Sequence, residues 1–294
     1  MNWILLSVLT ALFVSCKDVI SKKTLQDVHY LVVALGLRLF ALPFLFCLLF
    51  FIEIPQIGEN FVLVLISAGI MNIFSTILYM RALNASDLSL TIPMISFSPL
   101  LLLITSPIIL GEFPSNTGVV GVLLIVTGSY VLNIKEKSKG YMQPLIGLLK
   151  QRGPRLMLIV ALIWSVSSNF DKLGIQNSSP MFWTIAVITF STLGLIPIVM
   201  VRAGKHLKQD LSASTGNIKW LVLLGLISSL TLVCQMNAID MALVTYVISI
   251  KRSSAVFSVI FGGLIFKEKH LKDRIIGAII MTIGVIVITL SGSS

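Results

Sequence analysis

Ten long apolar segments separated by short polar loops constrain the fold of this chain more than any other feature of its sequence. An α-helix rises about 1.5 Å per residue, so about 20 apolar residues span the hydrocarbon core of a bilayer. Segments of this length, or nearly so, lie at approximately 3–21, 30–52, 60–81, 88–110, 117–134, 155–173, 180–201, 217–237, 242–266 and 274–291. We therefore predict an all-α integral membrane protein with ten transmembrane helices.

The composition agrees with a lipid environment. Of 294 residues, 56% are hydrophobic and 12% are charged, whereas about a quarter of the residues of an average soluble chain are charged. The net charge of +10 would suggest nucleic-acid binding in a soluble protein, but most basic residues here lie in short loops between apolar segments. Loop charges of this kind orient membrane proteins, so we expect no nucleic-acid partner.

The two halves of the chain repeat each other. An offset of 156 residues, without a gap, pairs Ser98 with Ser254, Glu112 with Glu268, Gly121 with Gly277 and Gly128 with Gly284. In the earlier part of each half, an offset of 150 residues pairs Ser15 with Ser165 and Lys22 with Lys172. We predict a first five-helix repeat at 1–134, a basic cytoplasmic linker at 135–154 and a second five-helix repeat at 155–294.

An odd number of helices in each repeat requires the second repeat to cross the membrane in the opposite orientation to the first. Loop charges agree with this inversion, because loops that follow odd-numbered segments hold 17 of the 22 Lys and Arg residues. The loop after the fourth segment contains Glu112 and no basic residue, whereas its counterpart contains Lys267, Lys269, Lys272 and Arg274. Since positive loops stay in the cytoplasm, we predict that both termini face outward.

Four basic residues lie inside the predicted helices: Lys17, Arg38, Lys251 and Arg252. A charge at the bilayer centre costs at least about 2.5–3.5 kcal/mol on insertion scales and is tolerated mainly in a cavity or an ion pair. Asp18 is the clearest acid within these segments, since Asp171 falls near the outer end of the sixth. We therefore predict a net positive, substrate-binding interior formed by Lys251, Arg252, Arg38, Lys17 and Asp18, with an anion as the missing partner.

A purely structural role is the alternative for Lys17 and Arg38. Asp18 could pair with Arg38 across neighbouring helices, and Lys17 could extend its ammonium group to the cytoplasmic headgroups. Both interpretations stay open for these residues. The alternative is weaker for Lys251 and Arg252, because the nearby acids are too few to neutralise two adjacent cations.

Prolines and glycines predict bends and close packing. Prolines fall inside three of the predicted helices, at Pro43, Pro93, Pro99, Pro107 and Pro197. Each removes a backbone hydrogen bond, which indicates either hinges around a central cavity or fixed kinks. Gly121 and Gly128, with Gly277 and Gly284, place small residues seven apart and predict close helix contacts.

Patterns typical of enzymes, metal sites and cofactor sites are missing from the sequence. Cys16, Cys47 and Cys234 are scattered over apolar segments, and the three histidines lie far apart in loops. We therefore expect no disulfide framework, no metal and no cofactor. Gly-rich phosphate loops, paired-histidine zinc helices and acidic clusters are also absent from the sequence, and we do not expect an enzyme.

Three features of the sequence stand together: ten predicted helices, a duplicated five-helix unit, and Gly111-Glu112 and Lys267-Glu268 at the ends of helices four and nine. With these features the chain resembles the EamA-type branch of the drug/metabolite transporter superfamily. The resemblance covers essentially the whole chain. It implies a basket in which helices 1–4 and 6–9 hold a substrate such as an amino acid, drug, other metabolite, nucleotide sugar or phosphorylated sugar, while helices 5 and 10 pack peripherally. Lys251-Arg252 also looks like the basic pair by which sugar-phosphate translocators hold phosphate.

Three functions follow in order of preference. The first is a secondary transporter, an exporter or exchanger, of a small anionic metabolite that works by alternating access between inverted repeats. The second is an exporter or flippase of amphipathic or lipid-linked compounds, which Phe, Trp and Met side chains in the cavity would favour. The third is a polytopic membrane enzyme.

We expect a metabolite and the lipid bilayer as partners, a homodimer as one option for assembly, and the plasma membrane of a bacterium or archaeon as the location.

Overall fold

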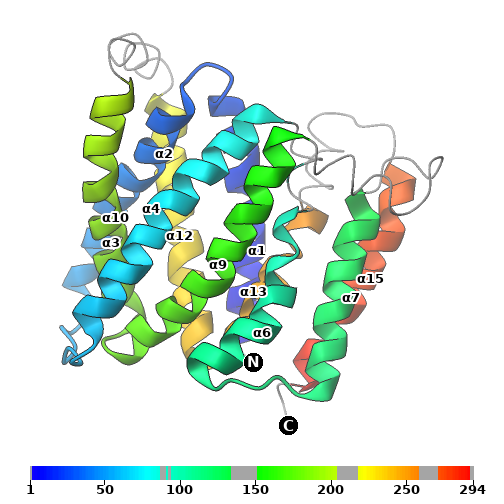
Figure 1. Cartoon of the computed structure of the whole chain (residues 1–294). Coiled ribbons are helices and arrows are strands. Elements are labelled where there is room, and N and C mark those ends of the chain that lie inside the picture. Colours follow the sequence, from blue (N-terminus) through cyan, green and yellow to red (C-terminus); the bar gives the residue numbers. More distant parts are fainter. Residues whose placement is uncertain are drawn as a thin grey trace.

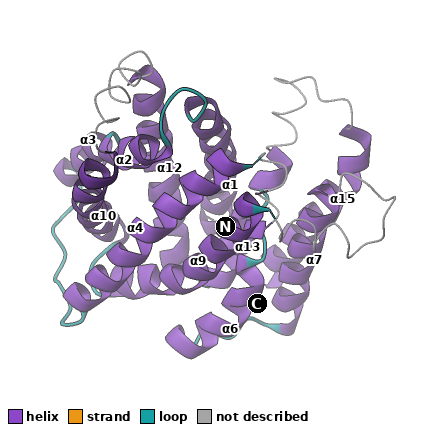
Figure 2. Ribbon diagram, turned by 45° about the horizontal axis from the view of Figure 1, so that its top comes forward, coloured by secondary structure: helices purple, strands orange, loops and turns teal. Residues whose placement is uncertain are grey.

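The computed structural model describes residues 2–86, 91, 94–133, 151–203, 218–257 and 271–291. These residues form helices joined by turns and loops, with no strand among them (Figures 1 and 2). The elements are α1 (Asn2–Thr24), α2 (Tyr30–Leu39), α3 (Ala41–Cys47), η1 (Leu48–Phe50), α4 (Phe61–Ala85), α6 (Ser98–Leu110), α7 (Asn116–Asn133), α9 (Arg152–Gln176), α10 (Pro180–Ala203), α12 (Ile218–Met241), α13 (Val244–Lys251) and α15 (Leu271–Ser291). Most of the predicted linker, with Glu268 and its loop, lies outside the described residues.

Six helical stretches in the described ranges are long and apolar enough to cross a membrane: α1, the α2–α3–η1 stretch, α4, α9, α10 and α12. Three shorter apolar helices, at Ser98–Leu110, Asn116–Val131 and Ile276–Ser291, fall in the fourth, fifth and tenth predicted segments. The chain is therefore an all-helical membrane protein over the part described. Helix α9 begins at Arg152, so the last three residues of the predicted linker are helical instead.

The outer faces of these helices are apolar. Val62, Phe74, Leu162 and Leu193 are each more than half exposed. A water-soluble protein rarely exposes large apolar side chains over so many helices, whereas lipid solvates them without cost. These faces are the surface that contacts the acyl chains.

The second predicted segment is broken into two helices next to Arg38. Helix α2 ends at Leu39 and α3 begins at Ala41. Pro43 lacks the N–H group that would bond to the carbonyl of Leu39, so the helical ladder is interrupted at this point. A Cβ atom at Gly225 of α12 would lie 2.4 Å from the carbonyl carbon of Phe40, so the break is packed directly against α12.

The ninth predicted segment is also interrupted, at its basic pair. Helix α13 ends at Lys251, and Arg252 and Ser253 form a turn before helical residues resume at Ser254. The hydroxyl of Ser253 donates to the carbonyl of Ile250 at 2.7 Å, an interaction that competes with the helical ladder. Arg252 thus caps the carboxyl end of α13, where the helix dipole favours positive charge.

Helices α7 and α15 pack together at the edge of the molecule, beside the other helices (Figure 1). A Cβ atom added at Gly284 would lie 2.8 Å from the carbonyl oxygen of Gly121, and one added at Gly128 would lie 2.8 Å from that of Gly277. Backbone atoms fill these positions, so only glycine permits this separation. The close packing predicted for these four glycines is confirmed.

The Gly111-Glu112 sequence turns the chain after α6. Gly111 adopts a left-handed conformation with φ of 68°, and its N–H donates to the carbonyl of Pro107. Glycine takes this conformation without a Cβ penalty. The turn brings the Glu112 carboxylate to the start of α13, where it accepts from the N–H of Val244 at 2.9 Å, and to Lys172, whose ammonium lies 3.8 Å away.

Candidate functional site

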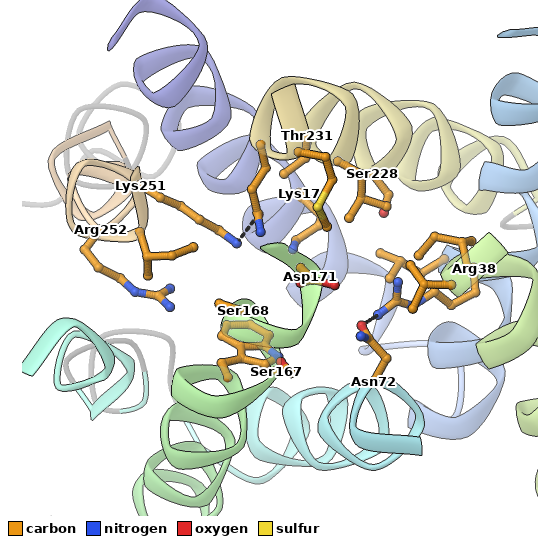
Figure 3. Close-up of a pocket in the computed structure, with 18 residues that line it drawn as sticks. Lys17, Arg38, Asn72, Ser167, Ser168, Asp171, Ser228, Thr231, Lys251 and Arg252 are labelled. Carbon is orange, nitrogen blue, oxygen red and sulfur yellow. Dashed lines mark hydrogen bonds between the residues drawn. The ribbon is translucent and has the colours of Figure 1, made fainter. Parts of the chain in front are cut away.

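A central cavity lies among seven of the helices and collects the charged residues of the interior (Figure 3). Its volume is about 80 Å³. The lining residues come from α1, α2, α4, α9, α10, α12 and α13, together with Arg252; they are Lys17, Leu37, Arg38, Asn72, Trp164, Ser167, Ser168, Asp171, Val187, Ile188, Ser228, Thr231, Leu232, Gln235, Met236, Ile248, Lys251 and Arg252. Residues of α7 and α15 are not among them.

Lys251 and Arg252 share one end of the cavity with Trp164 of α9. The Nζ atom of Lys251 donates to Oε1 of Gln235 at 2.6 Å, and Nε of Arg252 donates to the hydroxyl of Ser98 at 3.0 Å. Both cations lie 5.4 Å from the centre of the Trp164 ring, within range of a cation–π interaction. Each cation is therefore held by neutral groups.

Arg38 lies at the other end of the cavity (Figure 3). Its Nη2 atom donates to Oδ1 of Asn72 at 3.1 Å and to the hydroxyl of Thr76 at 2.8 Å, and its Nε has no hydrogen-bond partner. The predicted structural alternative, a pair between Arg38 and Asp18, is wrong. Asp18 instead accepts a short hydrogen bond from the hydroxyl of Tyr79.

Lys17 and Asp18 point to different surroundings although they are adjacent. Lys17 lines the cavity, with its Nζ atom 5.5 Å from the centre of the Tyr79 ring, and does not extend to the headgroups as the alternative proposed. Asp18 is 4% exposed and is not among the lining residues. Of the five residues predicted to bind substrate, four therefore line the cavity.

Asp171 is a lining residue that the sequence analysis left out of the site. It is buried, and its carboxylate accepts from Nε1 of the fully buried Trp183 at 3.0 Å. We placed it near a helix end, but α9 continues to Gln176. Its spacing from Trp164 and Ser167, seven and four residues, would have shown a polar stripe on one face of the helix.

The charge balance of the cavity is positive. Four bases and one acid are found among the described lining residues, and the single ion pair in the described ranges, Lys172 with Glu112, lies elsewhere. Buried cations without carboxylate partners are costly. An anion entering this cavity would gain charge-assisted hydrogen bonds from groups that now bond only to amides and hydroxyls.

Comparisons with known proteins agree with this architecture. The family described as the EamA-like transporter family matches residues 1–134 and 151–290. A solved structure described only as "Crystal structure of protein" is similar to this chain with a TM-score of 0.70 and 17% identity, over 99% of this chain and 97% of the other. At that identity the likeness concerns the fold alone. The search of curated proteins found no match.

Proposed function

Because the chain belongs to the EamA-like transporter family, whose members are membrane transporters, we propose that it is a secondary transporter of a small anionic metabolite. The main support for an anionic substrate is that one cavity is lined by four basic residues and, among the described residues, by a single acid. The basic residues are Lys17, Arg38, Lys251 and Arg252. An anion held there would offset the desolvation of these cations. We further propose that transport occurs without chemical conversion, so that the protein is not an enzyme.

The size of the cavity supports a small charged group. A cavity of roughly 10–15 Å³ is enough for one water molecule, so about 80 Å³ holds a few waters, or a carboxylate or phosphate group, in the conformation described. A lipid-linked compound is far larger. Of the Phe, Trp and Met side chains that would favour such a substrate, only Trp164 and Met236 are among the described lining residues, which gives the flippase little support.

Alternating access between two inverted halves is the mechanism we propose, and the α7–α15 contact supports it. Gly121 approaches Gly284 while Gly128 approaches Gly277, so the two helices run in opposite directions. In the 156-residue register, Gly121 corresponds to Gly277 and Gly128 to Gly284. The counterparts of Gly121 and Gly284 are therefore Gly277 and Gly128, which also contact each other, as expected for elements related by a two-fold axis.

A second pair of equivalent contacts, in which a lysine caps the carboxyl end of another helix, also relates the two halves. The Nζ atom of Lys22 donates to the carbonyls of Leu83 and Ser86 at 2.6 and 2.9 Å. In the second half, Nζ of Lys172 donates to the carbonyls of Ile239 and Ala242 at 2.5 and 3.1 Å. Leu83 and Ile239 are 156 residues apart, as are Ser86 and Ala242. Duplicated units explain this repetition of contacts between residues far apart in the sequence.

The orientation belongs to the same proposal. We propose ten membrane crossings in the plasma membrane, with the positively charged loops in the cytoplasm and both termini outside. A short peptide tag at the carboxyl terminus should react with a membrane-impermeant antibody on intact cells. A tag that reacts only after the cells are permeabilised would refute this orientation without affecting the proposed substrate class.

A ligand screen tests the substrate class. The purified chain should be stabilised against heating by members of an anionic metabolite library, because a ligand that binds the folded state raises its apparent stability. The same compounds should be taken up by proteoliposomes that contain the protein. They should leave the melting temperature of the Lys251→Gln variant unchanged. Lys219→Gln, which replaces an exposed lysine at the start of α12, is the matched control.

Stabilisation and uptake confined to neutral or cationic compounds would refute the anionic substrate. Chemical conversion of a compound by the purified protein in detergent, where no compartment exists, would refute transport without reaction and revive the membrane enzyme.

A further inference from the structure

A second hollow, separate from the central cavity, lies between the last turns of α4 and the first turns of α9. It is lined by Arg81, Arg152, Arg155, Leu156 and Ile159, and its volume is about 340 Å³. A Cβ atom at Gly153 would lie 2.4 Å from the hydroxyl of Ser86, so the two helix ends are in direct contact. In Figure 1 this region lies at the end of the molecule opposite the N and C labels.

Among the described residues, the three arginines of this hollow have no acidic partner. In the described part of the chain the one ion pair joins Lys172 to Glu112, and the guanidinium groups of the three arginines make no hydrogen bond there. The amino end of α9 adds to their charge, because Gln151 provides no side-chain cap and the first turn contains no acidic residue. Unsatisfied N–H groups at a helix start attract anions. The hollow is therefore a positive site that no acid of the described residues neutralises.

Apolar side chains continue from these arginines toward the middle of the membrane. Ile159 and Leu162 follow Arg155 by four and seven residues on α9 and are 48% and 56% exposed. Phe74, seven residues before Arg81 on α4, is 57% exposed. Residues at these spacings share a helix face. A ligand with an anionic head and an apolar tail matches the arginines above and the apolar strip beneath.

We propose that Arg81, Arg152 and Arg155 bind the phosphate of an anionic phospholipid, whose acyl chains lie along α4 and α9. Basic pockets between helices at the cytoplasmic surface are suited to lipid headgroups, and guanidinium groups bond to phosphate through two parallel N–H groups. A free phosphate ion uses only the upper part of the site. The apolar strip makes the lipid the better ligand. This site and the transported substrate are independent of each other.

Phosphatidylglycerol and phosphatidylcholine with the same short acyl chains test the proposal on the purified full chain. Phosphatidylglycerol should raise the melting temperature at concentrations at which phosphatidylcholine does not. The Arg152→Gln/Arg155→Gln double variant should bind phosphatidylglycerol about 30-fold more weakly, since each of the two basic groups near a membrane surface contributes about 1 kcal/mol toward anionic lipid. Native mass spectrometry should show bound phosphatidylglycerol on the wild type and much less on the double variant.

Arg202→Gln is the matched control, because Arg202 is an exposed arginine in the last turn of α10 and does not line the hollow. It should bind phosphatidylglycerol as the wild type does. The proposal fails if Arg202→Gln and the double variant lose the same affinity, which would indicate general surface charge. It also fails if inorganic phosphate stabilises the protein as well as phosphatidylglycerol does, or if phosphatidylcholine binds equally.

Discussion

Arg38 and Lys251 carry the same charge at opposite ends of the central cavity, but the protein holds them differently (Figure 3). Arg38 donates from Nη2 to two side chains of α4, Asn72 and Thr76, and is 8% exposed. Lys251 has one hydrogen bond, to the amide of Gln235, and lies over the ring of Trp164. Arg38 thus joins α2 to α4 through two acceptors, whereas Lys251 joins α13 to α12 through a single neutral acceptor.

This difference assigns the two ends separate tasks. Guanidinium is planar and keeps its geometry when it is bonded to fixed groups, whereas an ammonium group on a four-carbon chain exchanges partners readily. Lys251 can therefore exchange Gln235 for an incoming anion at the loss of a single hydrogen bond between α13 and α12. Arg38 cannot leave Asn72 and Thr76 without loosening α2 from α4, next to the break at Phe40. We infer that Lys251 and Arg252 bind the substrate and that Arg38 positions helices.

The largest predicted effect comes from removing the charge of Lys251. Lys251→Gln should lower transport in proteoliposomes about 100-fold, because loss of one partner of a buried charged hydrogen bond costs about 2–5 kcal/mol. Its melting temperature without ligand should stay near that of the wild type. Lys251→Arg should retain part of the activity. Equal transport by Lys251→Gln and wild type would reverse the assignment of the two ends.

Arg38→Gln should have an intermediate effect, mainly on stability and on the maximal rate of transport. Loss of the hydrogen bonds to Asn72 and Thr76, each worth about 1.5–3 kcal/mol when a charged group donates, should lower the melting temperature by at least about 6 °C. Maximal transport should fall about tenfold, with little change in the apparent substrate affinity. Kinetics measured over a range of substrate concentrations separate these quantities. A loss confined to affinity would mean that Arg38 contacts the substrate itself.

Asp171 lies between the two ends, and its neutralisation should act in the opposite direction. Asp171→Asn keeps an oxygen to accept from Trp183 but removes the one acid among the described lining residues. The cavity then becomes more positive, and anion affinity should rise about fivefold. Substrate release should slow for the same reason. Isothermal titration in detergent measures the affinity, and a fall in affinity would show that Asp171 bonds to a cationic part of the substrate.

The membrane helices could be predicted from hydropathy because lipid requires a long apolar stretch for each crossing. The predicted ends of the six longest lie within four residues of those in the structure. The break at Arg252 could not be predicted, since neither proline nor glycine marks it; it depends on the hydroxyl of Ser253 and on the tertiary contact between Arg252 and Ser98.

The lining of the cavity was predicted only in part, because the sequence shows the charges but not their tertiary contacts. Lys17, Arg38, Lys251 and Arg252 were found because an intramembrane charge is costly wherever it lies. Their partners were not found, because Asn72 and Gln235 are amides that serve equally well as ordinary helix contacts. Asp171 was missed because its depth was judged from an underestimated helix length. Charge thus shows which residues need a partner, but the fold is required to show which partner each one has.

The smallest predicted effect concerns Trp164, which contacts Lys251 and Arg252 at one end of the cavity but not Arg38 at the other. Trp164→Phe keeps an aromatic ring but weakens its attraction for Lys251 and Arg252, since Trp is the strongest cation–π partner. Apparent substrate affinity should fall about threefold. Trp220→Phe is the matched control, because Trp220 lies beneath Lys23 and Lys219, outside the cavity.

In a double-mutant cycle, the effect of Trp164→Phe on substrate affinity should be non-additive with that of Lys251→Gln and additive with that of Arg38→Gln, because only contacting residues couple. Coupling to Arg38 alone would show that the ring acts on the helix contact rather than on the substrate end.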